Sequence, residues 1–531
     1  MKKRIQKTLS LLLALLMLLS LLTACSNSAA PAETEQTGQT GETAPATSTE
    51  SSSGAKDSVI IGHYQEPATL DPNNQGDGAG FQVCANIYES LLMLDYDLKI
   101  QPSLAESWDI SDDGLVYTFH LRQGVTFQNG EPLTAEDCKF SYERAMVGGY
   151  AGSVTGNIDH VEAPDENTFV VYMTTPFAPA LDCFASHFLR IVSKKAVEDA
   201  GDSFTYAPFG AGTGPYEFVS WDSGSSIVLK AYEGYWGGAP AIKNATWRYF
   251  TDQGTLAIAV EAGDVDMGGI QMTDVANLEN MSDRKVMIGS MLVIQNIGFQ
   301  CDKAPYDNKL VRQAIAYSYD SEDMLIAAMG LEEGATLTAS PVVKGGLGYI
   351  EGLEPYPQDP EKAKQLLAEA GYPDGFTTTI YTPNAAFRKN MATYLQACLA
   401  DIGITANIEV MEQAALLEEI RAGNTPIFIM GFTGTSADSD FFLYGQYHSG
   451  QTYNYDKYEN AELDAILDEA RTITDTAKRD ELYREAVQLI YDEVPDVETF
   501  FINSAIGYNA DLNITFDPGT HYYVKDWSWN S

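Results

Sequence analysis

The sequence predicts an α/β protein with more than one domain. Hydrophobic periodicity alternates between strand and helix over residues 376–442, and this β-α-β-α-β order is typical of a mostly parallel sheet. The folded body, 57–531, has 475 residues, more than one hydrophobic core usually serves, so we expect two or three domains. The predicted elements are strands at 376–381, 404–410 and 426–430 and helices around 391–399 and 416–420, the second ending before Gly423. Nearer the N-terminus, 104–122 reads as a loop that leads into an alternating strand, and 124–130 as a short strand and turn. Thr134, with Glu136 and Asp137 after it, is expected to cap a helix.

The third of these strands opens into the loop 431–442, a polar run broken by glycines. Ligands of such sheets bind beyond the carboxyl ends of the strands, and glycine lets the backbone approach a ligand closely. We therefore expect a ligand at this loop. The alternative is an ordinary surface connection.

The N-terminus has the features of a secretory signal. Basic residues occupy positions 2, 3, 4 and 7, an apolar run covers 11–22, and Leu22-Thr-Ala-Cys25 follows. The apolar run of twelve residues is too short for a permanent membrane span. The pattern resembles a bacterial lipobox, which implies a signal peptide at 1–24 and a lipid on Cys25. The alternative is a cleaved signal whose cysteine stays unmodified.

Residues 26–56 contain no aromatic residue and no Val, Leu, Ile or Met, so they cannot form a core. We expect the segment 25–56 to be a lipidated cysteine followed by a disordered tether. A flexible coil of this length reaches roughly 30 Å.

The charge of the chain excludes one class of function. It has 32 basic and 74 acidic residues, for a net charge of −42, and removing the four basic residues of the signal leaves 28 against 74, or −46. A nucleic-acid binder needs a basic surface, so we predict no nucleic-acid partner. The acidity fits a soluble, exported monomer.

Five cysteines follow Cys25 at wide spacing without a CxxC pair, which predicts neither a metal knuckle nor a disulfide framework. We expect most of them to be small core residues.

Catalytic motifs do not occur in the sequence. The phosphate-loop, HExxH and GxSxG patterns are all missing, and the acid pairs Asp264/Asp266 and Asp438/Asp440 are of a kind that is usually solvated. The six histidines are far apart in sequence, which leaves open their convergence in space. We predict a protein that is no enzyme and carries no cofactor or metal, with a secreted hydrolase or transferase acting on peptide or glycan as the alternative.

Aromatic residues make up 11% of the chain and form local clusters that could line a cleft. We expect about one cluster in three to contact a ligand. The clusters are Tyr444/Tyr447, Tyr453/Tyr455/Tyr458 and Tyr235/Trp236.

Short motifs along the whole body resemble one family, the extracellular solute-binding proteins of family 5, which are dipeptide-, oligopeptide- and nickel-binding lipoproteins of ABC importers. The likeness covers essentially all of 57–531. It rests on Glu66-Pro, Ser107-Trp, Asp113-Gly, Tyr117-Thr-Phe-His-Leu-Arg122, Gly124-Val-Thr-Phe127, Ala135-Glu-Asp137, Gly212-Thr-Gly-Pro-Tyr216, Tyr235-Trp-Gly-Gly238, Gly263-Asp-Val-Asp266, Val311-Arg-Gln-Ala314, Asp359-Pro-Glu-Lys362 and Glu369-Ala-Gly-Tyr-Pro373.

The resemblance implies a two-lobed, periplasmic-binding-protein-like fold of type II with an extra subdomain inserted in the first lobe. On this chain, lobe I is expected at 57–295 plus 499–531, the inserted subdomain at about 89–205, and lobe II at 296–498. Apolar strands with breakers near 292–300 and 497–503 independently support crossings between the lobes.

The function implied is capture of a solute, by family default a peptide, and its delivery to the transmembrane subunits of an ABC permease. The protein is then expected on the outer face of the bacterial cytoplasmic membrane, anchored through Cys25. A nickel chelate, a sugar or another solute is the alternative ligand.

The resemblance also implies ligand-binding residues, and here the chain departs from its relatives. In peptide-binding members the strand at 426–430 runs into Gly-Trp, and an aspartate three residues after that Trp pairs with the peptide amine. Phe432 and Thr435 occupy these two positions. Either Asp438 has taken over the amine or the ligand has no free α-amine, and Asp438 could instead cap the following helix. The arginine that some dipeptide binders use for the ligand's carboxylate has no counterpart near Thr382-Pro-Asn384, although Arg388 lies on the next helix. Gly434, Arg388 and Glu66 complete the expected site.

Overall fold

A computed structural model describes residues 56–434, 438–519 and 521–530. Its central feature is an eleven-stranded sheet in the order β15-β14-β16-β12-β17-β11-β1-β10-β9-β8, with β13 beside β17. We use lobe I, lobe II and inserted subdomain for the ranges expected above, whose boundaries stay predictions. The strands are β1 (Ser58–His63), β8 (Tyr216–Asp222), β9 (Ser226–Ala231), β10 (Asn244–Tyr249), β11 (Met267–Ile270), β12 (Arg284–Phe299), β13 (Ala335–Leu337), β14 (Thr377–Pro383), β15 (Thr405–Met411), β16 (Ile427–Thr433) and β17 (Asp496–Asn509).

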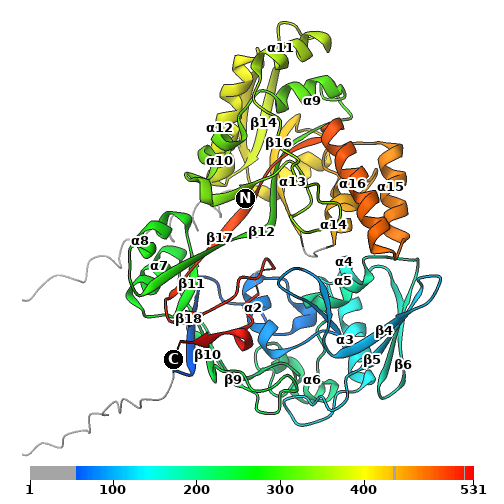
Figure 1. Ribbon diagram of the computed structural model, residues 1–531, viewed down its shortest axis with the longest axis vertical. Coiled ribbons are helices and arrows are strands. Elements are labelled where there is room, and N and C mark those ends of the chain that lie inside the picture. The colour runs from blue at the N-terminus through cyan, green and yellow to red at the C-terminus, as the bar shows by residue number, and fades with distance from the viewer. Residues whose placement is uncertain (1–55, 435–437, 520, 531) are drawn as a thin grey trace, which may run out of the picture. The chain divides into compact units, whose positions relative to one another are not determined.

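The two longest strands, β12 and β17, form an antiparallel ribbon that belongs to both lobes (Figure 1). At one end β17 also pairs with β11 of lobe I, and at the other β12 pairs with β16 of lobe II. The pairing of the ribbon is interrupted in the middle: Ser290 faces Asn503 but Ile294 faces Phe501, so that residues 291–293 of β12 stand opposite the single residue Ile502 of β17. A second register shift follows between Gln295 and Asn296. A bulge of this kind bends a strand and turns its side chains out of the ladder.

Lobe II contains the β-α-β-α-β unit that the sequence predicts. Strand β14 pairs in parallel with β15 and β16, and helices α12 (Ala386–Asp401) and α13 (Gln413–Arg421) connect them. Strand β16 runs three residues further than predicted because Phe432 and Thr433 pair with Ile294 and Val293 of β12. The loop after it is correspondingly shorter, since helix α14 (Ser439–Tyr447) begins at Ser439.

The inserted subdomain has a sheet of its own, in the order β4-β5-β7-β6, with a separate apolar core. Its strands are β4 (Ala105–Ile110), β5 (Val116–Leu121), β6 (Ile158–Asp165) and β7 (Thr168–Met173). The sequence predicts a loop before β5, and this is wrong for 105–110, because pairing with β5 makes that mostly polar segment a strand. The short strand expected within 124–130 is also wrong, since Thr126 makes only an isolated bridge to Pro132.

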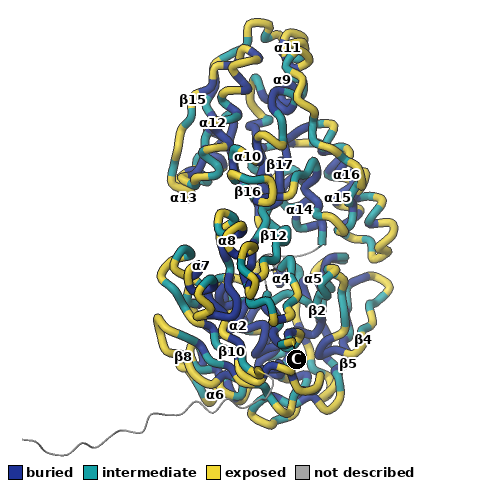
Figure 2. Tube along the Cα trace, turned by 60° about the vertical axis from the view of Figure 1, so that its left-hand side comes forward, coloured by how far each residue is buried: buried dark blue, intermediate teal, exposed yellow. Residues whose placement is uncertain are grey.

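Helix α3 (Ala135–Val147) begins as expected after Thr134, whose side chain forms a capping box with Asp137. The remaining helices and short strands surround the two sheets, and Figure 2 shows buried segments within both lobes. They are β2 (Leu92–Leu94), β3 (Ile100–Pro102), β18 (Leu512–Asn513), β19 (Ser528–Trp529), α2 (Gly78–Ile87), α4 (Gly152–Thr155), α5 (Ala180–Ala185), α6 (Lys194–Ala200), α7 (Gln253–Ala262), α8 (Val275–Glu279), α9 (Lys309–Ala316), α10 (Ser321–Met329), α11 (Pro360–Glu369), α15 (Ala461–Thr472) and α16 (Thr476–Glu493).

Four of the five cysteines in the body are buried core residues, as expected, and Cys301 is partly buried. In the part of the chain that the structure describes, no helix is both long enough and apolar enough to cross a membrane.

The inserted subdomain also contacts lobe II away from the ribbon. The backbone N–H of Ala178 donates to the carbonyl of Arg471 at 2.8 Å, and the Arg471 guanidinium lies 5.0 Å from the centre of the Phe177 ring. The two lobes are therefore connected both by β12 and β17 and by this contact at α15.

A glycine in the ribbon provides a test of its packing. A Cβ at Gly298 would lie 2.2 Å from the ring of Phe428 and 2.7 Å from the Asp456 carboxylate. We expect Gly298→Ala to lower the free energy of unfolding by about 1–3 kcal/mol, because overpacking a dense core forces its neighbours to shift. Urea unfolding measures the change.

Gly269 of β11 is the matched control, since no atom lies within 4 Å of the place that an added methyl group would take. Gly269→Ala should change stability by less than about 0.5 kcal/mol. Equal effects of the two substitutions would contradict tight packing at Gly298.

Candidate functional site

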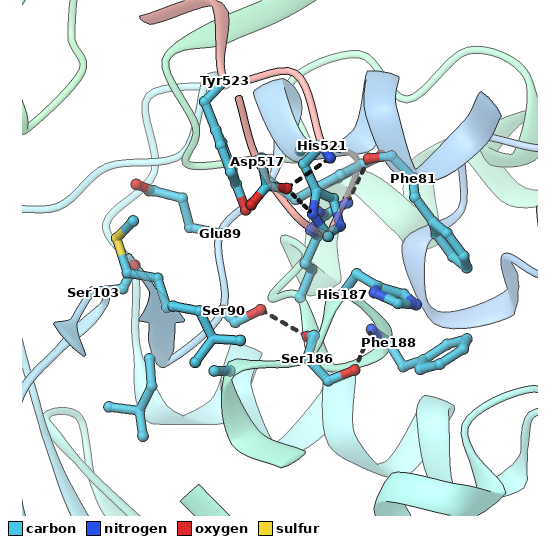
Figure 3. A pocket seen from close by; sticks show the side chains of 18 of the residues that line it. Phe81, Glu89, Ser90, Ser103, Ser186, His187, Phe188, Asp517, His521 and Tyr523 are labelled. Atoms are coloured by element: carbon cyan, nitrogen blue, oxygen red, sulfur yellow. Dashed lines mark hydrogen bonds and ion pairs between the residues drawn. The ribbon is translucent and has the colours of Figure 1, made fainter. Parts of the chain in front are cut away.

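A cavity of about 720 Å³ lies where the ribbon bulges, and residues of both lobes line it. Figure 3 shows part of its wall, with Glu89 on one side and Phe81, His187 and Phe188 on the other. Helix α2, the β12 bulge at 291–293, the end of β16 at Thr433 and Gly434, the turn 235–240 and the C-terminal segment 517–526 all contribute lining residues.

Glu89 holds one wall of the cavity together. Its carboxylate accepts hydrogen bonds from Thr213 Oγ1 at 2.9 Å, Tyr235 OH at 2.8 Å and Trp236 Nε1 at 2.9 Å. Burial raises the pKa of Glu89, and the three hydrogen bonds oppose that rise. Glu89 thus binds both the segment 212–214, through Thr213, and the Tyr235/Trp236 pair. It therefore positions the aromatic side chains that face the cavity.

The glycines beside Thr213 are required by close backbone packing. A Cβ at Gly212 would lie 1.8 Å from the carbonyl oxygen of Ile87, and one at Gly214 would lie 2.7 Å from the same atom. A side chain at either position would push this segment away from the end of α2.

The opposite wall is aromatic. The His187 ring lies 3.8 Å from that of Phe81 and 5.7 Å from that of His521, while His521 Nδ1 lies 2.9 Å from the Asp517 carboxylate. Burial, together with the nearby His521 and Arg190, keeps the pKa of His187 well below its ordinary value, so this ring is neutral at pH 7. Its Nε2 has no hydrogen-bond partner among the described residues.

Charged side chains of both signs line the cavity. The acids Glu89, Asp182, Asp517 and Asp526 outnumber the bases Arg190 and Lys525. Lys525 and Asp526 pair with each other at 2.9 Å. Arg190 is only 5% exposed, and its Nη1 donates to the Phe81 carbonyl at 3.3 Å. The cavity therefore places a few charged groups in a largely apolar lining, which suits a ligand that carries both charge and apolar surface.

Two of the residues expected at the site lie close to the cavity. Gly434 lines it, and Phe432 is directly before the lining residue Thr433. Phe432 is buried against Phe441, Phe442 and Tyr453, with ring centres 5.2 to 5.7 Å away. Thr435 and Cys25 lie outside the described residues.

The other three expected residues make contacts within the protein and are not among the described residues that line the cavity. Glu66 accepts from Trp221 Nε1 at 2.6 Å and Gly224 N at 2.9 Å, and Arg388 Nε donates to Gln295 Oε1 at 2.8 Å. Asp438 caps α14 through Asp440 N at 2.9 Å and pairs with Arg479 at 2.7 Å. Roles for these three in ligand binding stay predictions.

Of the aromatic clusters noted in the sequence, Tyr235/Trp236 lines the cavity, whereas Tyr447 and Tyr458 belong to a core of lobe II. Sequence reasoning missed Glu89, His187, Arg190 and the segment 517–526. A signal for Arg190 existed, because it is a charge inside the apolar run 188–192, where burial is expected.

The described part of the chain supports neither a metal site nor catalysis by a nucleophilic side chain. No group of three or more His, Cys, Asp or Glu side chains there could hold a metal ion. The Asp517–His521 pair resembles the base and orienting acid of a hydrolase, but no described serine, threonine or cysteine hydroxyl or thiol is hydrogen-bonded to that ring.

Comparison with known proteins places this chain in a family. The chain is 30% identical to the glutathione-binding protein GsiB of Salmonella paratyphi A over 83% of this chain and 88% of that protein. It superposes on HbpA2 from Haemophilus parasuis with a TM-score of 0.83, at 26% identity over 89% of this chain and 100% of that one. It also superposes on DppA from Helicobacter pylori in complex with the peptide STSA, with a TM-score of 0.71 at 29% identity over 90% and 99%.

These structures confirm the two-lobed α/β fold that the sequence resemblance implies. The model of the bacterial extracellular solute-binding proteins, family 5, matches residues 99–454. With a cavity that both lobes line, and with this match over most of its length, the chain belongs to the bacterial extracellular solute-binding proteins, family 5.

Proposed function

We propose that this protein captures a peptide between its two lobes and delivers it to the transmembrane subunits of an ABC importer. The observation that carries the proposal is the cavity of about 720 Å³, which the bulged ribbon and residues of both lobes enclose. A ligand in this position touches both lobes, so closing them around it adds contacts. The peptide-binding relative DppA and the glutathione-binding relative GsiB support a peptide-like ligand.

We propose that the protein releases its bound solute without changing it chemically. GsiB and DppA are binding proteins, and no described hydroxyl or thiol is hydrogen-bonded to His521 in the cavity. A secreted hydrolase or transferase is the competing function. Incubation with peptides, followed by mass spectrometry for cleaved products, distinguishes the two.

We also propose that the protein works outside the cell, as a monomer anchored through Cys25 to the outer face of the cytoplasmic membrane. The signal-like residues 1–24 and the polar segment after Cys25 support this proposal.

Replacing the cysteine tests the anchor. We expect Cys25→Ala to release the protein into the medium or to leave uncleaved precursor, because stable anchoring takes more than one acyl chain and only a lipidated cysteine supplies them here. Fractionation and intact-mass measurement follow the outcome. A cleaved variant retained on the membrane as well as wild type would contradict lipidation.

Ligand binding should close the lobes. The chain superposes less well on peptide-bound DppA than on HbpA2, although DppA is more similar in sequence, and a rotation between the lobes would account for this. We expect small-angle scattering to show a smaller radius of gyration when a bound peptide is present. A peptide that binds by calorimetry and leaves the scattering curve unchanged would place the site on one lobe.

Asp438 provides a separate test of how the ligand amine is recognised. Its carboxylate pairs with Arg479, whose side chain is 6% exposed. We expect Asp438→Asn to lower the free energy of unfolding by about 3 kcal/mol or more, because it leaves a buried cation without its partner. Chemical unfolding measures this, and calorimetry measures peptide affinity in parallel.

The exposed Asp112 is the control, since Asp112→Asn should be neutral within about 0.5 kcal/mol. If Asp438→Asn unfolds like wild type but loses peptide affinity, Asp438 is the amine-binding acid that the resemblance suggests.

A further inference from the structure

Four arginines of the described residues are buried, and three of them have their charge or their donors satisfied within the protein. Arg284 pairs with Asp283 at 3.0 Å and Arg479 pairs with Asp438 at 2.7 Å. Arg312 has no ion pair in the described chain, but it donates to the carbonyls of Val494, Tyr306 and Glu493, each at 2.7 Å. These three side chains stabilise the fold.

Arg190 is the fourth, and it differs from the others. A guanidinium has five N–H donors. In the described part of the chain, that of Arg190 makes one side-chain hydrogen bond, to the Phe81 carbonyl at 3.3 Å, and takes part in no ion pair. It is 5% exposed and lines the cavity. A buried cation in this state lowers stability unless something else pairs with it.

The groups around Arg190 supply no negative charge. Cys84, Tyr523 and Tyr88 lie near enough to interact with it. Burial raises the pKa of the Cys84 thiol to about 12 and raises the pKa values of the two tyrosine hydroxyls above their ordinary value. His187, also nearby, is neutral. All four groups are therefore uncharged at pH 7, and the missing partner has to come from the cavity.

We propose that Arg190 binds a carboxylate of the ligand, the α-carboxylate if the ligand is a peptide. This inference rests on the proposed function and names the chemical group of the ligand that the site recognises. The guanidinium is planar and matches a carboxylate with two parallel hydrogen bonds. Four acids and two bases line the cavity, so a ligand with one negative group and compensating positive charge fits better than a phosphate dianion.

Peptide retention tests the proposal. The protein is unfolded in guanidinium chloride to remove bound ligand, refolded, and mixed with two libraries of tri- to pentapeptides that lack Asp and Glu. One library has a free C-terminal carboxylate and the other a C-terminal amide, and mass spectrometry quantifies the retained peptides. We expect wild type to prefer the acids by roughly 10- to 100-fold, since hydrogen bonds to charged groups are the strong ones.

Two variants at this position separate charge from geometry. Arg190→Gln should lose the preference, and Arg190→Lys, which keeps the charge but not the planar fork, should retain a part of it. Wild type that retains acids and amides equally would overturn the carboxylate role while leaving peptide binding intact.

Stability without ligand provides an independent readout. Arg190→Met should unfold at the same temperature as ligand-free wild type or at a higher one, because it removes a charge that has no partner. Arg312→Met is the matched control and should unfold at a lower temperature, because three backbone carbonyls, of which those of Val494 and Tyr306 are buried, lose their donor.

If neither library is retained, the proposed peptide binding is wrong. The unfolding temperatures of Arg190→Met and Arg312→Met then test by themselves whether Arg190 has a structural role. An Arg190→Met variant as destabilised as Arg312→Met would show that Arg190 is structural and overturn the inference.

Discussion

The structure depends on the antiparallel ribbon of β12 and β17. These two neighbouring strands connect the part of the sheet in lobe I to the part in lobe II. Strands β16, β14 and β15 follow on the side of β12, and β11, β1, β10, β9 and β8 follow on the side of β17, with which β13 also pairs. A ribbon held by a backbone ladder is stiff along its length. At the first of its two irregularities, residues 291–293 of β12 are out of register with β17, and these three residues line the cavity. The same irregularity thus allows bending and forms part of the binding surface.

Burial of charge is the second constraint on the site. Glu89 is held by three donors and Asp517 by His521, so these acids are committed to positioning the walls of the cavity. Arg190 has no comparable partner in the described chain. A binding protein of this kind accepts some loss of stability in the empty state, and that loss is recovered when a ligand supplies the opposite charge.

The contact between Ala178 and Arg471 bears on how the lobes move. It joins the inserted subdomain to α15, whereas the ribbon joins the lobes elsewhere. Arg471 also pairs with Asp440 at 3.3 Å, close to the Asp438–Arg479 pair at the start of α14. Burial raises the pKa of Asp440 to about 7, which the nearby Arg471 opposes. This polar cluster lies within lobe II, so lobe motion must either preserve the contact with the inserted subdomain or break the Ala178–Arg471 hydrogen bond and the packing of Arg471 on the Phe177 ring.

The sequence by itself determined the β-α-β-α-β unit of lobe II, the capped helix after Thr134 and the family, because periodicity and capping are local and the motifs span the whole body. It also indicated Tyr235/Trp236 as cavity residues. It did not find β4, whose polar sequence becomes a strand only through pairing with β5.

The composition of the cavity was decided by tertiary structure alone. Glu89, Arg190 and the segment 517–526 are far apart along the chain, and only the return of the C-terminal segment to lobe I places them around one space. The role of Asp438 shows the same limit: its position in the loop suggested a ligand contact, while its pairing with Arg479, 41 residues later, depends on how α16 packs against α14. Local sequence carries propensity and pattern, but which charges meet is fixed by contacts between distant segments.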